Sequence, residues 1–142
     1  MSGHLLANVT CVAVGGRAIM IEGPPGSGKS SLALALLDRG AALVGDDGIE
    51  LEQSEGLLMA APPPTIAGKL EVRGVGIVER PSQHAPVALI LSLDAQAPRT
   101  PELAIREVLG NAIPALAFRP GDANQAIRAE LALEQFGLEV PG

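Results

Sequence analysis

The sequence is poor in aromatic side chains: its 142 residues include no Trp, no Tyr and only two Phe. Proteins that bind single-stranded nucleic acid stack bases on aromatic rings, and nucleic-acid binders in general carry an excess of Lys and Arg. This chain has 16 acidic and 10 basic residues, which gives a net charge of −6. We therefore expect no nucleic-acid partner.

Cysteine and long apolar runs are also scarce. Cys11 is the only cysteine, so it cannot form an internal disulfide, and this favours a reducing compartment. No apolar run reaches the length of a membrane span, and the N-terminus lacks the basic start and apolar core of a signal peptide. One cysteine and two histidines offer no zinc-site spacing. These features predict a cytoplasmic protein with no membrane partner.

The length and apolar content predict one domain over residues 1–142, because 47% of the residues are hydrophobic. Apolar, β-branched runs predict strands at 9–14, 17–22, 41–44, 49–51, 57–60, 70–78, 87–93 and 115–118. Helices are predicted at 29–39, at 101–109 with Thr100 as cap, and at 122–136 with Ile127, Leu131 and Phe136 facing inward. Strands alternating with helices indicate the α/β class.

The loop between the second strand and the first helix fits the pattern G-x-x-x-x-G-K-[ST]. It reads Gly23-Pro24-Pro25-Gly26-Ser27-Gly28-Lys29-Ser30, followed by Ser31. Glycines let backbone N–H groups approach phosphate oxygens, and the helix that follows directs its positive end at the same oxygens. In such a P-loop, the lysine neutralises phosphate charge and the serine hydroxyl is a ligand for Mg²⁺. The motif predicts binding of ATP and Mg²⁺.

Phosphoryl transfer also needs a carboxylate, and two places in the sequence offer one. Asp94 follows the apolar run 87–93, where a metal-binding aspartate usually stands in P-loop proteins. Asp46 and Asp47 follow the strand after the P-loop helix. Residue chemistry alone leaves both open, because Asp47-Gly48 also reads as a hairpin turn and Asp94 as a loop residue or helix cap.

About half of the chain resembles the catalytic domain of HPr kinase/phosphorylase. The similarity lies in CVAV at 11–14, the P-loop at 23–30, DRGAALVGDD at 38–47, APPPTIAG at 61–68 and LEVRGVGIV at 70–78. The resemblance implies a P-loop α/β domain related to phosphoenolpyruvate carboxykinase, with a mixed β-sheet and flanking helices. It further implies transfer of phosphate to a serine of HPr, the phosphocarrier protein of the sugar phosphotransferase system, and reversal of that transfer by phosphorolysis. Members form hexamers, and this chain is similar to the short form without the N-terminal domain.

The resemblance also implies roles for individual residues. Lys29 matches the P-loop lysine, Ser30 a Mg²⁺ ligand and Glu71 a second metal ligand. Asp47 matches the general base of the kinase direction, with Asp46 beside it as a helper or metal contact. A later arginine of the family matches Arg99.

Two departures from the family pattern bear on function. Asn8 stands where the family has a histidine, and the stretch 118–122 has only one basic residue, Arg119, where the family has a basic phosphate-binding loop. These departures keep two alternatives open beside the HPr kinase. One is a P-loop kinase with another acceptor, and the other is a nucleotide-sensing module without catalysis.

Overall fold

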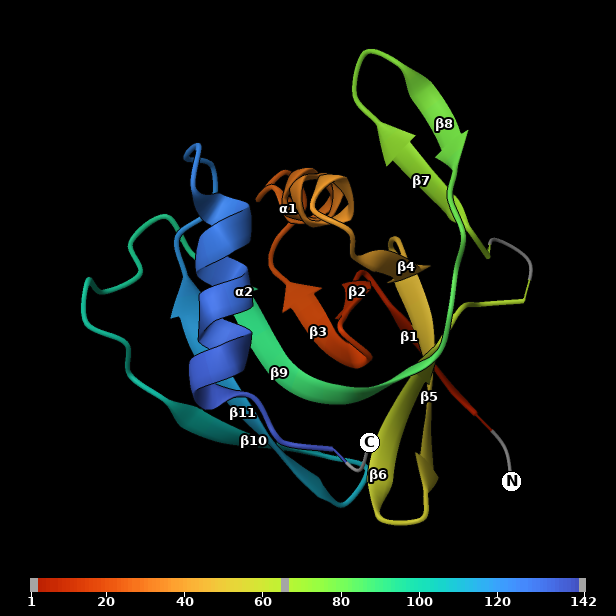
Figure 1. Ribbon diagram of the computed structural model, residues 1–142, viewed down its shortest axis with the longest axis vertical. Coiled ribbons are helices and arrows are strands. Elements are labelled where there is room, and N and C mark those ends of the chain that lie inside the picture. Colours follow the sequence, from red (N-terminus) through yellow and green to blue (C-terminus); the bar gives the residue numbers. More distant parts are fainter. Residues whose placement is uncertain (1–2, 65–66, 141–142) are drawn as a thin grey trace.

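The computed structural model describes residues 3–64 and 67–140 of the chain, and these residues form a curled mixed sheet with two helices (Figure 1). The N-terminal half holds β1 (His4–Ala7), β2 (Thr10–Val14), β3 (Arg17–Glu22), α1 (Lys29–Asp38), β4 (Ala42–Gly45), β5 (Gly48–Ser54) and β6 (Leu57–Ala61). The C-terminal half holds β7 (Lys69–Val72), β8 (Gly76–Glu79), β9 (Ala85–Leu93), β10 (Ala104–Val108), β11 (Asn111–Phe118) and α2 (Gln125–Phe136). The predicted α/β class is confirmed.

Strand β9 organises the main sheet, whose strand order is β1-β5-β6-β9-β3-β2-β4. One edge of β9 pairs in parallel with β3. Its other edge is shared, because Ala85 and Pro86 pair with β6 while residues from Ile90 to Leu93 pair in parallel with β11. The strands β3, β9 and β11 therefore end at the same edge of the sheet, and ligands of open α/β sheets bind at such carboxyl ends.

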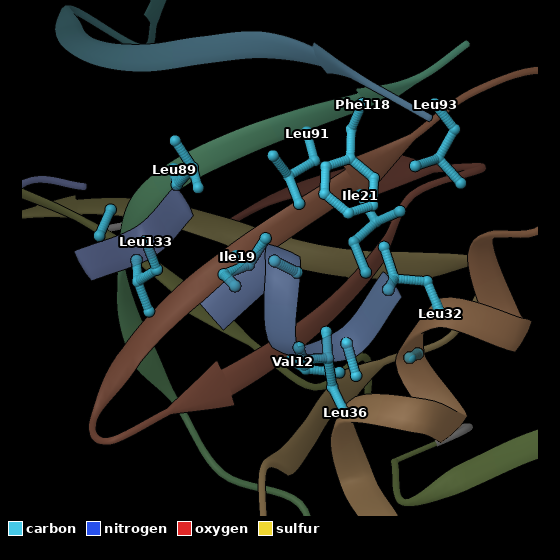
Figure 2. Close-up of a cluster of buried hydrophobic side chains, with 14 of the residues drawn as sticks. Val12, Ile19, Ile21, Leu32, Leu36, Leu89, Leu91, Leu93, Phe118 and Leu133 are labelled. Atoms are coloured by element: carbon cyan, nitrogen blue, oxygen red, sulfur yellow. The ribbon is translucent and has the colours of Figure 1, made fainter. Parts of the chain in front are cut away.

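Alternation along the central strands builds one apolar core on each face of the sheet. One face carries Val12, Ile19, Ile21, Leu89 and Leu91, which pack against Leu32 and Leu36 of α1 and Leu133 of α2 (Figure 2). The opposite face carries Cys11, Met20 and Ile90, which are covered by Ile49, Leu51 and Leu58 of β5 and β6. Both cores hold β3, only the first of them also holds α1, and the P-loop connects these two elements.

The predicted strand at 70–78 is a hairpin. Leu70 pairs with Val78 and Val72 pairs with Gly76, so the chain reverses at Gly74, whose φ is +82°. The inner face of this hairpin packs on α1 through the buried Leu70, and Figure 1 shows the hairpin as an arm that projects beyond the main sheet. The glycine predicted to break the strand in fact turns it back on itself.

The predicted helix at 101–109 is wrong, because this segment contains the edge strand β10. Residues 104–108 pair antiparallel with β11 through a two-residue turn at Leu109-Gly110. Both turn residues have positive φ, +49° and +82°, as a tight hairpin turn requires. The pairing available from β11 overrides the helix-start pattern at Thr100 and Pro101.

The last helix exists close to the predicted range, and Phe136 packs against the core as predicted, but the other residues of its buried face differ from the predicted ones. Ala126, Ala129 and Leu133 point into the core, whereas Ile127 and Leu131 are 40% and 54% exposed. Small residues at the contact let α2 lie close to α1 and β9, so the larger side chains face outward. Across the described residues, no helix has the length and apolar character needed to cross a bilayer.

Candidate nucleotide-binding and catalytic site

The P-loop is shaped by glycines with left-handed backbone conformations. The φ angles of Gly26 and Gly28 are +80° and +105°, values that side chains with a Cβ rarely adopt. The Ser27 N–H donates to the Pro24 carbonyl at 3.1 Å and closes a turn inside the loop. A Cβ on Gly23 would lie 2.5 Å from the Ser27 Oγ and 3.2 Å from the Leu93 Cβ, so any larger residue here displaces the buried Ser27 side chain.

The N-terminus of α1 is open to an anion. Within the described parts of the chain, the N–H groups of Gly26, Gly28, Lys29 and Ser30 have no backbone acceptor. The Ser27 Oγ is buried and lacks a partner in the same parts of the chain. Unsatisfied N–H groups and the helix dipole together favour a negatively charged ligand at this place.

The Lys29 side chain folds back over the loop. Its Nζ donates to the carbonyl oxygens of Gly23 at 2.8 Å and Pro24 at 3.3 Å. The ammonium therefore lies above the same loop whose N–H groups have no acceptor, and phosphate oxygens are stronger acceptors for it than these two carbonyls. Ser31, the last residue of the predicted phosphate-binding set, is exposed on the first turn of α1.

Asp46 joins the P-loop helix to two other elements. Its Oδ1 accepts hydrogen bonds from the Ser30 Oγ at 2.7 Å and the Thr10 Oγ1 at 3.1 Å. Its Oδ2 accepts one from the Glu71 backbone N–H at 3.3 Å. The carboxylate is thus tied to β2, α1 and β7 at once.

The Asp47 side chain, unlike that of Asp46, is not held by hydrogen bonds within the described residues. This side chain is exposed, and the φ of Asp47 is +64°. Its carbonyl accepts a hydrogen bond from the Asn8 N–H at 3.1 Å, so position 8 lies directly beside it. Of the two adjacent aspartates, Asp46 is held by three donors and Asp47 keeps its carboxylate free.

The alternative carboxylate, Asp94, is engaged in its own loop. Its N–H donates to the Phe118 carbonyl at 2.9 Å and its Oδ1 accepts from the Gln96 N–H at 2.8 Å. In the described chain it has no hydrogen bond to the P-loop. The structure therefore brings Asp46, and not Asp94, to Ser30.

The remaining predicted residues lie at different distances from this centre. Glu71 reaches Asp46 through its backbone, and its side chain is exposed on the β7–β8 hairpin. Arg99 is exposed in the loop after β9, at a cavity of about 580 Å³ that Arg119 and Arg128 also line. Neither Lys29 nor Asp47 lines this cavity. The loop that follows β11 does approach the P-loop, since a Cβ on Gly28 would lie 3.7 Å from Pro120. The structure thus joins Ser30 to Asp46, with Lys29 and Asp47 as their chain neighbours, and leaves Arg99 at the side.

Two neighbouring residues of β2 have different roles: Cys11 belongs to the apolar core, and Thr10 reaches the site. Cys11 is fully buried, and this burial raises the pKa of its thiol, so it is a core residue rather than a nucleophile. Thr10 was not singled out from the sequence, yet its hydroxyl reaches Asp46 across 36 residues. The only sequence signal for Thr10 is a single hydroxyl within an apolar run.

The oxygen atoms at this site suit Mg²⁺ bound together with a nucleotide, and they do not form a metal site made of protein ligands alone. Among the described residues, no three His, Cys, Asp or Glu side chains gather as a metal centre. Mg²⁺ prefers hard oxygen ligands and takes one or two of them from protein when phosphates supply others. Ser30 Oγ and the adjacent Asp46 are oxygens of this kind.

The fold and the loop define a P-loop α/β domain. A family model described as the HPr Serine kinase C-terminal domain matches residues 2–86, which is more than half of the chain. The chain belongs to this family.

Curated relatives and a solved structure agree with this assignment. HPr kinase/phosphorylase of Clostridium tetani is 46% identical over 73 residues, and that of Clostridium acetobutylicum is 42% identical over 69 residues. These matches cover 51% and 49% of this chain but 24% and 23% of the relatives, so the chain spans about a quarter of their length. The structure of the HPr(Ser) kinase/phosphatase from Coxiella burnetii matches with a TM-score of 0.82 and 26% identity, over 93% of this chain and 95% of that one.

Proposed function

We propose that this chain is the catalytic domain of an ATP- and Mg²⁺-dependent protein serine kinase whose acceptor is an HPr-type phosphocarrier protein. The observation that carries the proposal is the pair of adjacent aspartates at the P-loop serine. Asp46 is bound to the Ser30 hydroxyl at 2.7 Å, and Asp47 presents an exposed carboxylate beside it. Family membership supports HPr as the acceptor.

The P-loop and Lys29 perform the binding part of this proposal. The free N–H groups at the start of α1 hold phosphate oxygens, and Lys29 turns from the Gly23 and Pro24 carbonyls to the phosphates. Ser30 donates a hydrogen bond to Asp46, and its lone pairs would hold the metal ion together with Glu71 as a second ligand. Bound Mg²⁺ supplies neutralisation of the phosphate charge that develops during transfer.

Asp47 performs the proton transfer. The acceptor serine oxygen forms a bond to the γ-phosphorus while the bond from that phosphorus to the β,γ-bridging oxygen breaks. The serine proton passes to the Asp47 carboxylate, and ADP leaves with the electron pair of the broken bond. A general base contributes here because a neutral serine hydroxyl is a weak nucleophile.

Nucleotide binding tests the first half of the proposal. We expect wild-type protein to bind a fluorescent ADP analogue, and Lys29→Ala to weaken this binding about tenfold or more, because a charge-assisted contact to phosphate is lost. Lys69→Ala is the matched control, since Lys69 is the only other lysine and is exposed on β7. Equal affinities of Lys29→Ala and wild type would contradict the role of the loop.

A second candidate function is a nucleotide sensor without catalysis. Asn8 favours it, because this residue lies against Asp47, where the family resemblance places a histidine. Slow ATP hydrolysis without a partner, absent in Asp47→Asn, supports the kinase. Tight binding of ATP with neither hydrolysis nor transfer to any protein supports the sensor.

Reversal of the transfer and assembly into an oligomer belong to the same proposal, and a kinase with another acceptor is an alternative to it. Incubating phosphorylated acceptor with inorganic phosphate tests phosphorolysis, which yields pyrophosphate. Proteome-wide phosphoserine mass spectrometry tests for another acceptor of a P-loop kinase. The family supports a cytoplasmic homo-oligomer of six copies, which native mass spectrometry of the purified chain tests.

A further inference from the structure

Thr10 is the one polar or charged residue that is buried in the described parts of the chain, with 1% of its surface exposed. It lies on β2, whose neighbouring residues Cys11 and Val12 are fully buried and apolar. A hydroxyl in such surroundings is destabilising unless it forms a hydrogen bond. A valine of almost the same shape would fill the place without that penalty, so the hydroxyl calls for an explanation.

The hydroxyl of Thr10 donates to the Asp46 Oδ1 at 3.1 Å. The same oxygen accepts the Ser30 hydroxyl at 2.7 Å, and the Glu71 N–H holds the other carboxylate oxygen at 3.3 Å. Rotation about the bond to a carboxylate group is otherwise nearly free. Three donors from three different elements therefore fix the plane of the Asp46 carboxylate.

A fixed carboxylate decides the direction of the Ser30 hydroxyl. Ser30 has one O–H proton and two lone pairs. When its proton points at Asp46 Oδ1, its lone pairs point away from that carboxylate, which is the orientation a cation ligand needs. If the carboxylate turns, the Ser30 proton follows it and the lone pairs lose this orientation.

We propose that Thr10 is a positioning residue for the metal ligand Ser30: it holds the Asp46 carboxylate, which in turn orients the Ser30 hydroxyl toward Mg²⁺ bound with the nucleotide. This inference rests on the proposed nucleotide and Mg²⁺ site. Thr10 itself touches neither nucleotide nor metal, so removal of its hydroxyl affects the Mg²⁺ response rather than the contacts of the P-loop with phosphate.

The test is a Mg²⁺ titration of binding of the fluorescent ADP analogue to the full chain, with a parallel measurement in excess chelator. We expect Thr10→Val to raise the Mg²⁺ concentration for half-maximal enhancement about tenfold, as the loss of a hydrogen bond to a charged group produces. Binding in chelator should equal that of the wild type. Thr10→Ser restores the hydroxyl and should restore the Mg²⁺ response.

Cys11→Ala is the control for damage to β2, because it removes a buried atom from the adjacent residue without touching Asp46. If Thr10 has only a structural role, Thr10→Val lowers nucleotide binding equally with and without Mg²⁺, and Cys11→Ala has the same effect. This result overturns the inference. Thr10→Ala replaces the valine variant if that variant does not fold. If Mg²⁺ does not change nucleotide binding by the wild-type protein, the proposed metal site and this inference are both overturned. If Mg²⁺ enhances binding by the wild type, and Thr10→Val needs the same Mg²⁺ concentration for half-maximal enhancement, this inference alone is overturned.

Discussion

The two adjacent aspartates should respond in opposite ways to the same replacement by asparagine. Asp46 accepts three hydrogen bonds, from the Thr10 and Ser30 hydroxyls and from the Glu71 N–H. An asparagine offers one oxygen and one NH₂ group. With its oxygen toward the hydroxyls, its NH₂ group faces the Glu71 N–H, donor against donor; in the flipped orientation the oxygen reaches only Glu71.

The size of the effect follows from these contacts. The variant loses at least one hydrogen bond, and the remaining hydrogen bonds have a neutral amide as acceptor in place of a charged carboxylate. Hydrogen bonds to charged groups contribute about 1.5–3 kcal/mol each. We therefore expect Asp46→Asn to reduce the free energy of unfolding by about 2–4 kcal/mol, which lowers the Tm by roughly 6–12 °C in a domain of this size.

Asp47→Asn is the matched control, because the Asp47 side chain is exposed and its left-handed backbone suits asparagine well. Its Tm should stay within about 1 °C of the wild type. Thermal unfolding followed by circular dichroism, at one pH and without nucleotide, measures both variants. Equal shifts in the two variants, or a larger shift in Asp47→Asn, would refute the reasoning that only Asp46 is held by internal donors.

Three further predictions concern the loop, the core and the buried thiol. Gly23→Ala places a Cβ 2.5 Å from the Ser27 Oγ, so the Ser27 side chain must move within the P-loop, and nucleotide affinity should fall with little change in fold; equilibrium titration checks this. Leu36→Ala should reduce the free energy of unfolding by about 2–5 kcal/mol in urea titrations, whereas Leu34→Ala on the exposed side of α1 should change it little. Burial raises the pKa of the Cys11 thiol. Folded protein therefore keeps this proton while unfolded protein loses it above about pH 8.5, so stability falls as pH rises through that value, and Cys11→Ala should lessen this fall in urea titrations at pH 8 and 10.

The parts of the site that lie together in sequence could be predicted from it. The P-loop sits between β3 and α1 as expected, since glycines, an apolar strand and a leucine-rich helix specify it within about twenty residues. The Asp46 network could not be predicted from the residues alone, because Thr10, Ser30 and Glu71 approach only after β2, β4 and the β7–β8 hairpin have packed on α1.

The errors in the fold have the same physical origin. Residues 101–109 carry a good helix start, but β11 offers them an edge to pair with, and Gly110 permits the tight turn that aligns the two strands. On α2, the apolar residues Ile127 and Leu131 were expected inside, yet close approach to α1 selects Ala126 and Ala129 for that face. In both cases the partner element, which the local pattern does not reveal, decides the outcome.

Transfer of phosphate to the acceptor tests the central claim most directly. Purified protein is mixed with Mg·ATP and the HPr-type phosphocarrier protein of the same organism, and the carrier is examined by intact mass. We predict a gain of one phosphoryl group on a serine, lost in Asp47→Asn while that variant still binds nucleotide. A carrier that stays unmodified although the wild-type protein binds ATP, or equal transfer by Asp47→Asn and the wild type, would contradict the account.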